Sequence, residues 1–224
     1  MRITSDHPGG IQACGDIVVV SSKDGTYILD VERMRPTQNR LAGAGEAAGI
    51  AYHPEHNRHF LMTARGEALY ASGCTDLQKC GFGEGTKVPR DEEQPVVELA
   101  ASWDTGGINL FYSEHDQQMY VVGFETDGTK NLLVVQRLVI DRVTPDSVPW
   151  HRTKFAYSLG PANKIEVFSN LTPLDPTFRN AGYVDVVRSD GRIYLDAVSA
   201  PRQFDPTTGY VMRRERFEVV APAE

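Results

Sequence analysis

The sequence predicts an all-β protein, and three observations support that prediction. Short apolar runs such as "DIVVV" and "NLLVVQRLVI" have the length of strands. Turn-forming Asp-Gly pairs lie between such runs in "SSKDGTY", "RSDGRI" and "ETDGTK". Helix signals are scarce, and "SNLTPLDPTFRN" holds too many prolines to continue as a helix. A chain of 224 residues is long enough for a core, so we expect a single domain over residues 1–224.

A short repeated motif, which we call the glycine step, precedes pairs of these strands along the chain. Four segments begin with Gly-Gly or Ala-Gly followed by Ile or Tyr: "HPGGIQACGDIVVV", "EAAGIAYHPEHNRHFLMTA", "DTGGINLFYSEHDQQMYVVGF" and "RNAGYVDVVRSDGRIYLDAV". Their aligned glycines are Gly10, Gly49, Gly107 and Gly182. Each segment continues as a strand, a polar turn and a second strand. The pattern predicts these second strands at about residues 16–21, 58–64, 118–124 and 192–198.

A unit of three or four antiparallel strands that starts with this step is typical of a β-propeller blade. Small residues let backbones approach closely near a crowded central axis. We therefore expect a β-propeller-like fold with four clear blades. The long interval before Gly182 contains "TKFAYSLG" and "NKIEVFSNL", which leaves room for a divergent fifth blade. The other interpretation is a larger ring, of which this chain supplies part.

Several of these segments carry a resemblance to known proteins. "FDPTTGYV" is similar to the outer-strand turns of β-propeller repeat proteins. "HPGGIQ", "GGINL", "MYVVGF", "FRNAGY" and "RIYLDAV" resemble segments of some secreted microbial propeller-like proteins without a clear activity. The resemblance covers most of the chain and implies the fold. It implies no catalytic residue, because a fold does not determine a function.

Composition restricts the partners. The formal net charge is −7 and the pI is about 5.4, which argues against nucleic acid as a partner because phosphate binding needs clustered Lys and Arg. No apolar run reaches the roughly 18 residues of a membrane span. The N-terminal "MRITSDHPGG" lacks the apolar centre of a signal peptide. We expect a secreted or periplasmic protein seen as its mature chain, with a cytoplasmic protein as the alternative.

The cysteines bear on the same question. Cys74 and Cys80 end a short segment flanked by glycines, "GCTDLQKCGFGEG", and a disulfide between them is expected in an oxidising compartment. Two unpaired thiols are the alternative. No Cys-x-x-Cys pair occurs that would indicate a zinc site.

The repeat alignment also predicts a site. Ionisable residues stand three positions before each aligned glycine: His7, Glu46, Asp104 and Arg179. In equivalent blades these side chains converge at one mouth of the central channel. His7, Glu46 and Asp104 are then candidate ligands of a divalent metal, and Arg179 is a candidate partner for an anionic group. Ordinary polar loop positions are the alternative interpretation.

Two further features belong to this prediction. Gln12 and Asn109 stand two residues after their glycines, as candidate neutral hydrogen-bonding residues of the channel or as exposed strand positions. "HPEHNRH" places His53, His56 and His59 in an expected hairpin turn. A solvated turn is the main interpretation of that segment, and a surface metal site is the alternative, because the segment is not the helical His-Glu-x-x-His motif.

Two functions follow as hypotheses. The first is a non-catalytic module that binds a small molecule, a glycan or a protein at the channel mouth or rim. The second is a metal-assisted hydrolase of the lactonase or phosphoesterase type, in which His7, Glu46 and Asp104 hold a divalent metal as cofactor. The sequence leaves open whether the protein is an enzyme.

Overall fold

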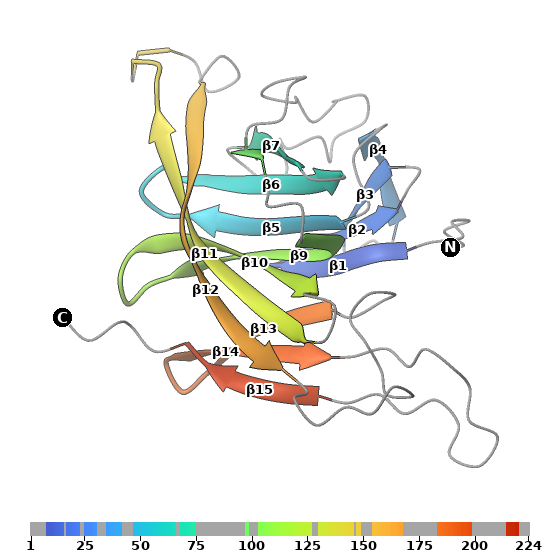
Figure 1. The fold of residues 1–224 in the computed structure, drawn as a ribbon. Helices are drawn as coiled ribbons and strands as arrows, with labels where there is room; N and C mark the ends of the chain where they lie inside the picture. Colours follow the sequence, from blue (N-terminus) through green and yellow to red (C-terminus); the bar gives the residue numbers. More distant parts are fainter. Residues whose placement is uncertain are drawn as a thin grey trace.

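A computed structural model describes residues 8–15, 17–22, 25–30, 35–41, 47–65, 68–74, 97–98, 103–126, 130–145, 147–148, 154–167, 183–198 and 214–219. Every regular element in this part of the chain is a strand, so the all-β prediction is confirmed there. The strands form four antiparallel sheets, and each sheet is made of strands that follow one another in sequence (Figure 1).

The first sheet contains β1 (Pro8–Cys14), β2 (Ile17–Ser22), β3 (Gly25–Asp30) and β4 (Arg35–Leu41). The second contains β5 (Ala47–His53), β6 (Arg58–Arg65), β7 (Ala68–Cys74) and β8 (Val97–Glu98). The third contains β9 (Trp103–Ser113), β10 (Gln118–Thr126), β11 (Asn131–Arg142) and β12 (Phe155–Val167). The fourth contains β13 (Tyr183–Ser189), β14 (Arg192–Val198) and β15 (Arg214–Glu218).

Each sequence repeat therefore supplies the first two strands of one sheet. The predicted second strands are confirmed as β2, β6, β10 and β14. The segments considered for a fifth blade include residues 155–167, which form β12. This strand pairs with β11 of the third sheet, from Arg142↔Phe155 to Asn131↔Val167. It extends the third sheet and does not begin a sheet of its own. Among the described residues no closed barrel or propeller ring is found, so the number of blades stays a prediction.

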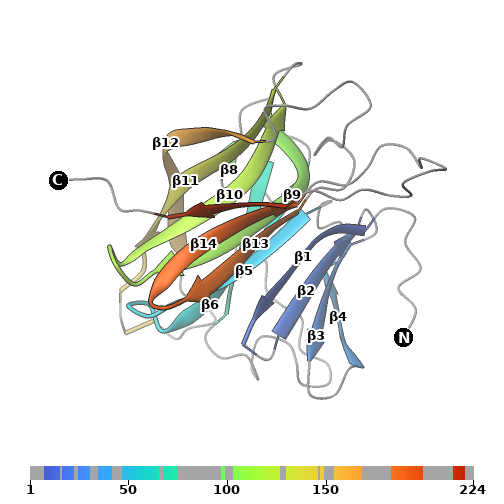
Figure 2. The same cartoon turned by 90° about the horizontal axis from the view of Figure 1, so that it is seen from below.

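The first strands of the sheets, β1, β5, β9 and β13, lie side by side at the centre of the molecule (Figure 1, Figure 2). Gly49 of β5 shows why small residues occur there. A Cβ atom on Gly49 would lie 2.8 Å from the main-chain nitrogen of Leu110 in β9. The two backbones thus approach more closely than any side chain permits, which agrees with the reason given for the glycine step.

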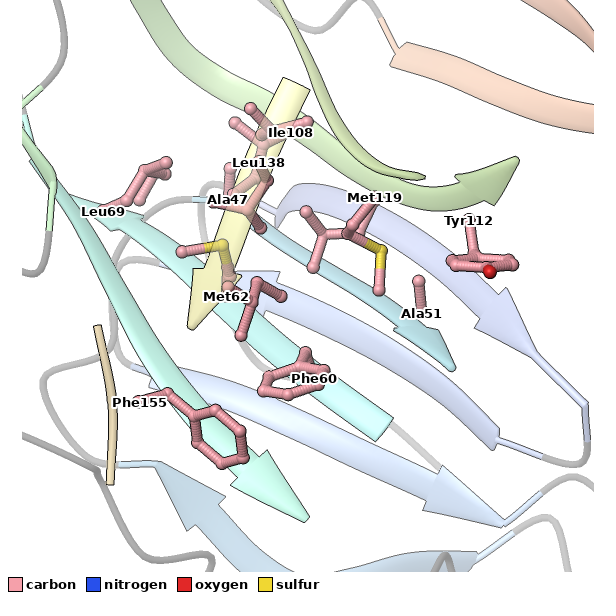
Figure 3. Packing of buried hydrophobic residues seen from close by; sticks show 14 of the residues in the cluster. Ala47, Ala51, Phe60, Met62, Leu69, Ile108, Tyr112, Met119, Leu138 and Phe155 are labelled. Carbon is pink, nitrogen blue, oxygen red and sulfur yellow. The ribbon is translucent and has the colours of Figure 1, made fainter. Parts of the chain in front are cut away.

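Three apolar clusters join neighbouring sheets in chain order. Ile17, Val19 and Ile28 of the first sheet pack against Ala48, Ile50 and Leu61 of the second. The second and third sheets share the largest cluster, in which Phe60, Met62, Met119 and Phe155 are prominent (Figure 3). The third and fourth sheets meet through residues that include Phe111, Phe124, Val184 and Leu195. Strand alternation allows this arrangement, because successive side chains of β9 point to opposite faces of the third sheet.

Candidate functional site

A pocket of about 400 Å³ lies where the central strands end, and we call it the inner-strand pocket. All four sheets contribute to it through the later residues of β1, β5, β9 and β13. Its lining residues are Gln12, Ala13, Cys14, Gly15, Ile50, Ala51, Tyr52, Pro54, Leu110, Phe111, Tyr112, Glu114, Asp185, Val186 and Arg188. This volume lies within the range of small-molecule sites.

A second pocket of about 520 Å³ lies between the β9–β10 turn and the β13–β14 turn, and we call it the hairpin pocket. Its lining is richer in charge and includes His115, Asp116, Tyr120, Asn163, Arg192 and Glu218. Glu114 and Arg188 line both pockets. The two pockets are therefore adjacent, and we call them together the groove, with this pair at the boundary between them.

Arg188 is held at that boundary from two directions. It is the penultimate residue of β13, opposite Ile193 of β14. Its Nη2 donates to the main-chain carbonyl of Tyr112 at 2.5 Å, and its Nη1 lies 3.4 Å from Glu114 Oε1. The Arg188 side chain remains 48% exposed. Because the neutral carbonyl fixes the guanidinium and leaves several N–H groups directed elsewhere, Arg188 is positioned to donate to a ligand.

The β9–β10 turn supplies the next pair of groups. The hydroxyl of Tyr120 donates to Asp116 Oδ2, while the Tyr120 ring stacks on Phe111 with centroids 5.2 Å apart. Burial and this hydrogen bond raise the pKa of Tyr120 to about 12. Burial alone would raise the pKa of Asp116, but hydrogen bonds from Tyr120, Ser113 and the main chain outweigh it and lower that pKa. At neutral pH the phenol is therefore protonated and the carboxyl group is ionised.

The far end of the groove carries a second ion pair. Arg192 of β14 lies 3.2 Å from Glu218 of β15. Both side chains are partly exposed, so the pair offers N–H donors and carboxylate oxygens to the groove as well as to each other.

The predicted cluster before the glycines lies largely outside the described residues. His7, Glu46 and Arg179 are not among them, and for Asp104 only the backbone is described, in β9 opposite Phe124. Their convergence and the metal site therefore stay predictions. Asp104 stands near the beginning of β9, whereas the groove lies beyond its end.

Gln12 and Asn109 connect sheets. The Gln12 carboxamide donates to the Leu110 carbonyl at 2.5 Å and accepts from the main-chain N–H groups of Ile50 at 2.8 Å and Leu110 at 3.0 Å. It thereby joins β1 to both β5 and β9. Asn109 is buried and donates to the carbonyl of Val184, which joins β9 to β13. Gln12 also lines the inner-strand pocket, whereas Asn109 does not.

The "HPEHNRH" segment forms the predicted hairpin turn between β5 and β6, but its histidines are less solvated than expected. His53 is buried, and its ring lies 4.4 Å from His56 and 5.2 Å from Tyr112. His56 contacts Phe155 and makes a 3.0 Å hydrogen bond to the carbonyl of Ile140. The turn packs against the third sheet, because the imidazole rings of His53 and His56 contact the rings of Tyr112 and Phe155 there.

The described residues show neither a metal site nor the expected disulfide. No group of three metal-ligating side chains is found among the described residues, including the three histidines of this turn. Cys74 ends β7, but Cys80 lies outside the described residues, so the disulfide stays a prediction. Cys14 is a free, half-buried thiol in the inner-strand pocket, and burial raises its pKa.

Sequence reasoning missed the charged groups of the groove. Glu114, Asp116, Arg188 and Arg192 stand in or beside the turns after the first strands, whereas the repeat alignment predicted a site at or before the beginning of those strands. The signal was present in "SEHDQQ" and "RSDGR", where charged residues fill equivalent turns of two repeats.

Comparisons with known proteins identify no relative by sequence. No protein family matches the chain, and no curated protein matches it. Among solved structures, the polysaccharide lyase Uly1 aligns at 8% identity and a TM-score of 0.39, over 96% of this chain and 53% of the lyase. An endo-1,4-β-xylanase from Bacteroides thetaiotaomicron aligns at 10% identity and a TM-score of 0.40, over 98% of this chain and 100% of the xylanase.

A prolyl endopeptidase aligns at 13% identity and a TM-score of 0.33, over 90% of this chain and 27% of that protein. The chain thus spans about half of the lyase and about a quarter of the endopeptidase. At these TM-scores the likenesses concern richness in β-structure and identify no activity. In the described part of the chain, no helix is long and apolar enough to cross a membrane.

Proposed function

We propose that this protein is a non-catalytic binding module whose ligand occupies the groove. The observation that carries the proposal is the presence of two adjacent pockets, of about 400 and 520 Å³, which share Arg188 and Glu114 in their linings. Ligand sites are typically concave and largely preformed, with a few fixed polar groups. Arg188 is such a group, because its hydrogen bond to the Tyr112 carbonyl holds it in place.

The ionisation of Tyr120 and Asp116 favours a binding role for these two groups over acid–base catalysis. A general acid or base works best when its pKa lies near the operating pH. The pKa of Tyr120 is raised to about 12 and the pKa of Asp116 is lowered, so both move away from neutrality. Because the single O–H of Tyr120 is donated to Asp116, both groups are suited to accept fixed hydrogen bonds from a bound molecule.

The hydrogen bonds and apolar clusters that hold the strands beside the groove support the same proposal. The Gln12 carboxamide and the Asn109 amide tie together the strands that end at the groove. Three packed clusters fix the four sheets in series. A preordered site loses less conformational entropy on binding, and this contributes to affinity.

The test is a screen of small molecules and short peptides by amide chemical-shift perturbation on isotope-labelled protein. We expect binders to perturb residues 110–116 and 185–193, and Arg188→Ala to weaken them at least about tenfold, as for loss of one charge-assisted hydrogen bond. Lys130→Ala is the control, since Lys130 pairs with Glu166 beyond the opposite end of β10. Binders that keep their affinity for Arg188→Ala, or that perturb only other surfaces, would contradict the proposal.

A further inference from the structure

We infer that the groove takes a neutral, hydroxyl-rich ligand, that is, a saccharide; this inference rests on the proposed function and specifies its ligand class. The starting point is the charge of the lining. Across the groove the carboxylates are Glu114, Asp116, Asp185 and Glu218, against the guanidinium groups of Arg188 and Arg192. An anionic ligand would meet an excess of carboxylates and is disfavoured.

A cationic ligand is disfavoured at two of the four carboxylates for a different reason, since these two already pair with arginines. Glu114 pairs with Arg188, Glu218 pairs with Arg192, and Asp116 accepts from Tyr120. The fourth, Asp185, is exposed and lies close to β15. The pKa of Arg216 is raised mainly by its hydrogen bond to Asp196, and the charge of Asp185 contributes to that shift. An ammonium group at Glu114 or Glu218 would have to displace the arginine that pairs with it.

The pairs nevertheless retain hydrogen-bonding capacity. A guanidinium has five N–H donors and a carboxylate has about four acceptor sites, so one ion pair leaves most of them free. N–H donors of Arg188 and Arg192 therefore alternate in the lining with acceptor oxygens of Glu114, Glu218 and the Asp116–Tyr120 pair, whose one phenolic hydrogen is used within the pair. A hydroxyl group donates and accepts through one atom, and it is the group that matches such an alternation without adding charge.

The apolar part of the lining fits the same class. Tyr52 is 36% exposed and lines the inner-strand pocket together with Ile50 and Val186. A pyranose ring presents C–H groups on one face and hydroxyl groups at its edge, so an aromatic surface beside paired polar groups accommodates both.

The experiment is calorimetric titration of the whole chain with neutral gluco-, manno- and galacto-configured sugars, as monosaccharides and tetrasaccharides. The corresponding uronic acids and amino sugars are titrated in the same way, as anionic and cationic ligands for comparison. We expect a neutral sugar to bind, with an affinity that changes less than about twofold between 50 and 500 mM NaCl because no net charge is neutralised. Arg192→Gln should weaken binding about tenfold, as should Glu218→Gln, since each removes one charge-assisted partner. Lys130→Ala should have no effect.

Two results would overturn the inference, and they are distinguishable from failure of the proposed function. If only the charged sugars bind, with strong salt dependence, the ligand is ionic. If no sugar binds while other small molecules bind in a manner sensitive to Arg188→Ala, the groove is a binding site for a different class. Failure of the proposed function itself would appear as the absence of any ligand sensitive to Arg188→Ala.

Discussion

At the scale of single residues, the carboxamide of Gln12 connects three strands at the centre of the molecule. It satisfies two main-chain N–H groups and one carbonyl on two other strands. Main-chain groups that are removed from water require such partners, and strands from different sheets cannot supply them through a ladder. Gln12 therefore acts as a connection between sheets as well as a residue of the inner-strand pocket.

Removing this connection should destabilise the fold. Gln12→Ala leaves the N–H groups of Ile50 and Leu110 without their partner, and we expect the free energy of unfolding to fall by about 2–4 kcal/mol. Urea denaturation followed by circular dichroism measures the change. Gln118→Ala is the matched control, because Gln118 bonds only to the nearby carbonyl of Asp116 and its loss should cost much less. Equal losses in the two variants would show that Gln12 does not connect the sheets.

Gly49 gives a second prediction at this scale. In Gly49→Ala the new methyl group would lie 2.8 Å from the Leu110 nitrogen, so β5 and β9 must separate. We expect a loss of about 1–3 kcal/mol in the free energy of unfolding, as for overpacking elsewhere. In Gly160→Ala the nearest atom is the Arg137 Cβ at 3.3 Å, so a smaller effect is expected. A neutral Gly49→Ala would contradict the close approach of the two strands.

The sequence predicted some of these residues and could not predict others. Gln12 and Asn109 were identified because their offset from the glycines is the same, and the structure places both in contact with neighbouring sheets. Arg188 and Glu114 were not identified, because their pairing joins residues 74 positions apart and depends on how β9 lies against β13. A repeat alignment indicates equivalent positions, whereas such a contact depends on the packing of one sheet on another.

At the scale of elements, the β5–β6 hairpin shows how a polar turn becomes part of a core. Burial lowers the pKa of His53, the charge of His56 lowers it further, and the charge of Glu55 opposes them. Tyr112 of β9 faces the same imidazole, and Arg58 lies over the Phe155 ring at 5.1 Å. The packed hairpin therefore favours neutral His53.

This gives stability a pH dependence with a defined sign. Because the folded pKa of His53 lies below its unfolded value of about 6.5, the unfolded chain takes up the proton first as the pH falls. The contribution of His53 is fully present above about pH 6.5 and is lost below it, down to the lowered folded pKa. Urea midpoints measured from pH 8 to pH 5 should fall less in His53→Gln than in the wild type.

The comparison has a matched control in the third sheet. His115 stands exposed in the β9–β10 turn, and His115→Gln should leave the decline unchanged. An unchanged decline in His53→Gln would show that other groups cause it.

The sequence predicted where the second strands lie, but it did not predict which sheet contains β12. Period-two patterning and Asp-Gly turns identified β2, β6, β10 and β14. Residues 155–167 read as strand-like but were considered for a separate blade. They pair with β11 along the whole of that 12-residue strand, from Arg142↔Phe155 to Asn131↔Val167. Pairing partners of this kind are set by tertiary contacts and not by local pattern.

At the scale of the whole molecule, four sheets in series place their first strands together and leave a groove beyond the ends of those strands. Of the residues expected to hold a metal, Asp104 stands near the beginning of β9, away from the residues that line the groove, and His7 and Glu46 lie outside the described residues. Binding in the groove and metal-assisted hydrolysis at His7, Glu46 and Asp104 are thus hypotheses that rest on different residues.

Elemental analysis of the purified protein separates these hypotheses. We expect no stoichiometric divalent metal if the groove is the functional site, and ligand binding unchanged by Asp104→Ala. A stoichiometric metal that is lost in Asp104→Ala, with the fold intact by circular dichroism, would instead support the hydrolase hypothesis.

A crystal structure of the protein with its ligand tests the central claim most directly. The account predicts that the ligand lies in the groove, with a direct hydrogen bond from Arg188 and contacts to the β9–β10 and β13–β14 turns. A ligand bound before the first strands, beside Asp104, or on the outer strands of a sheet would contradict it.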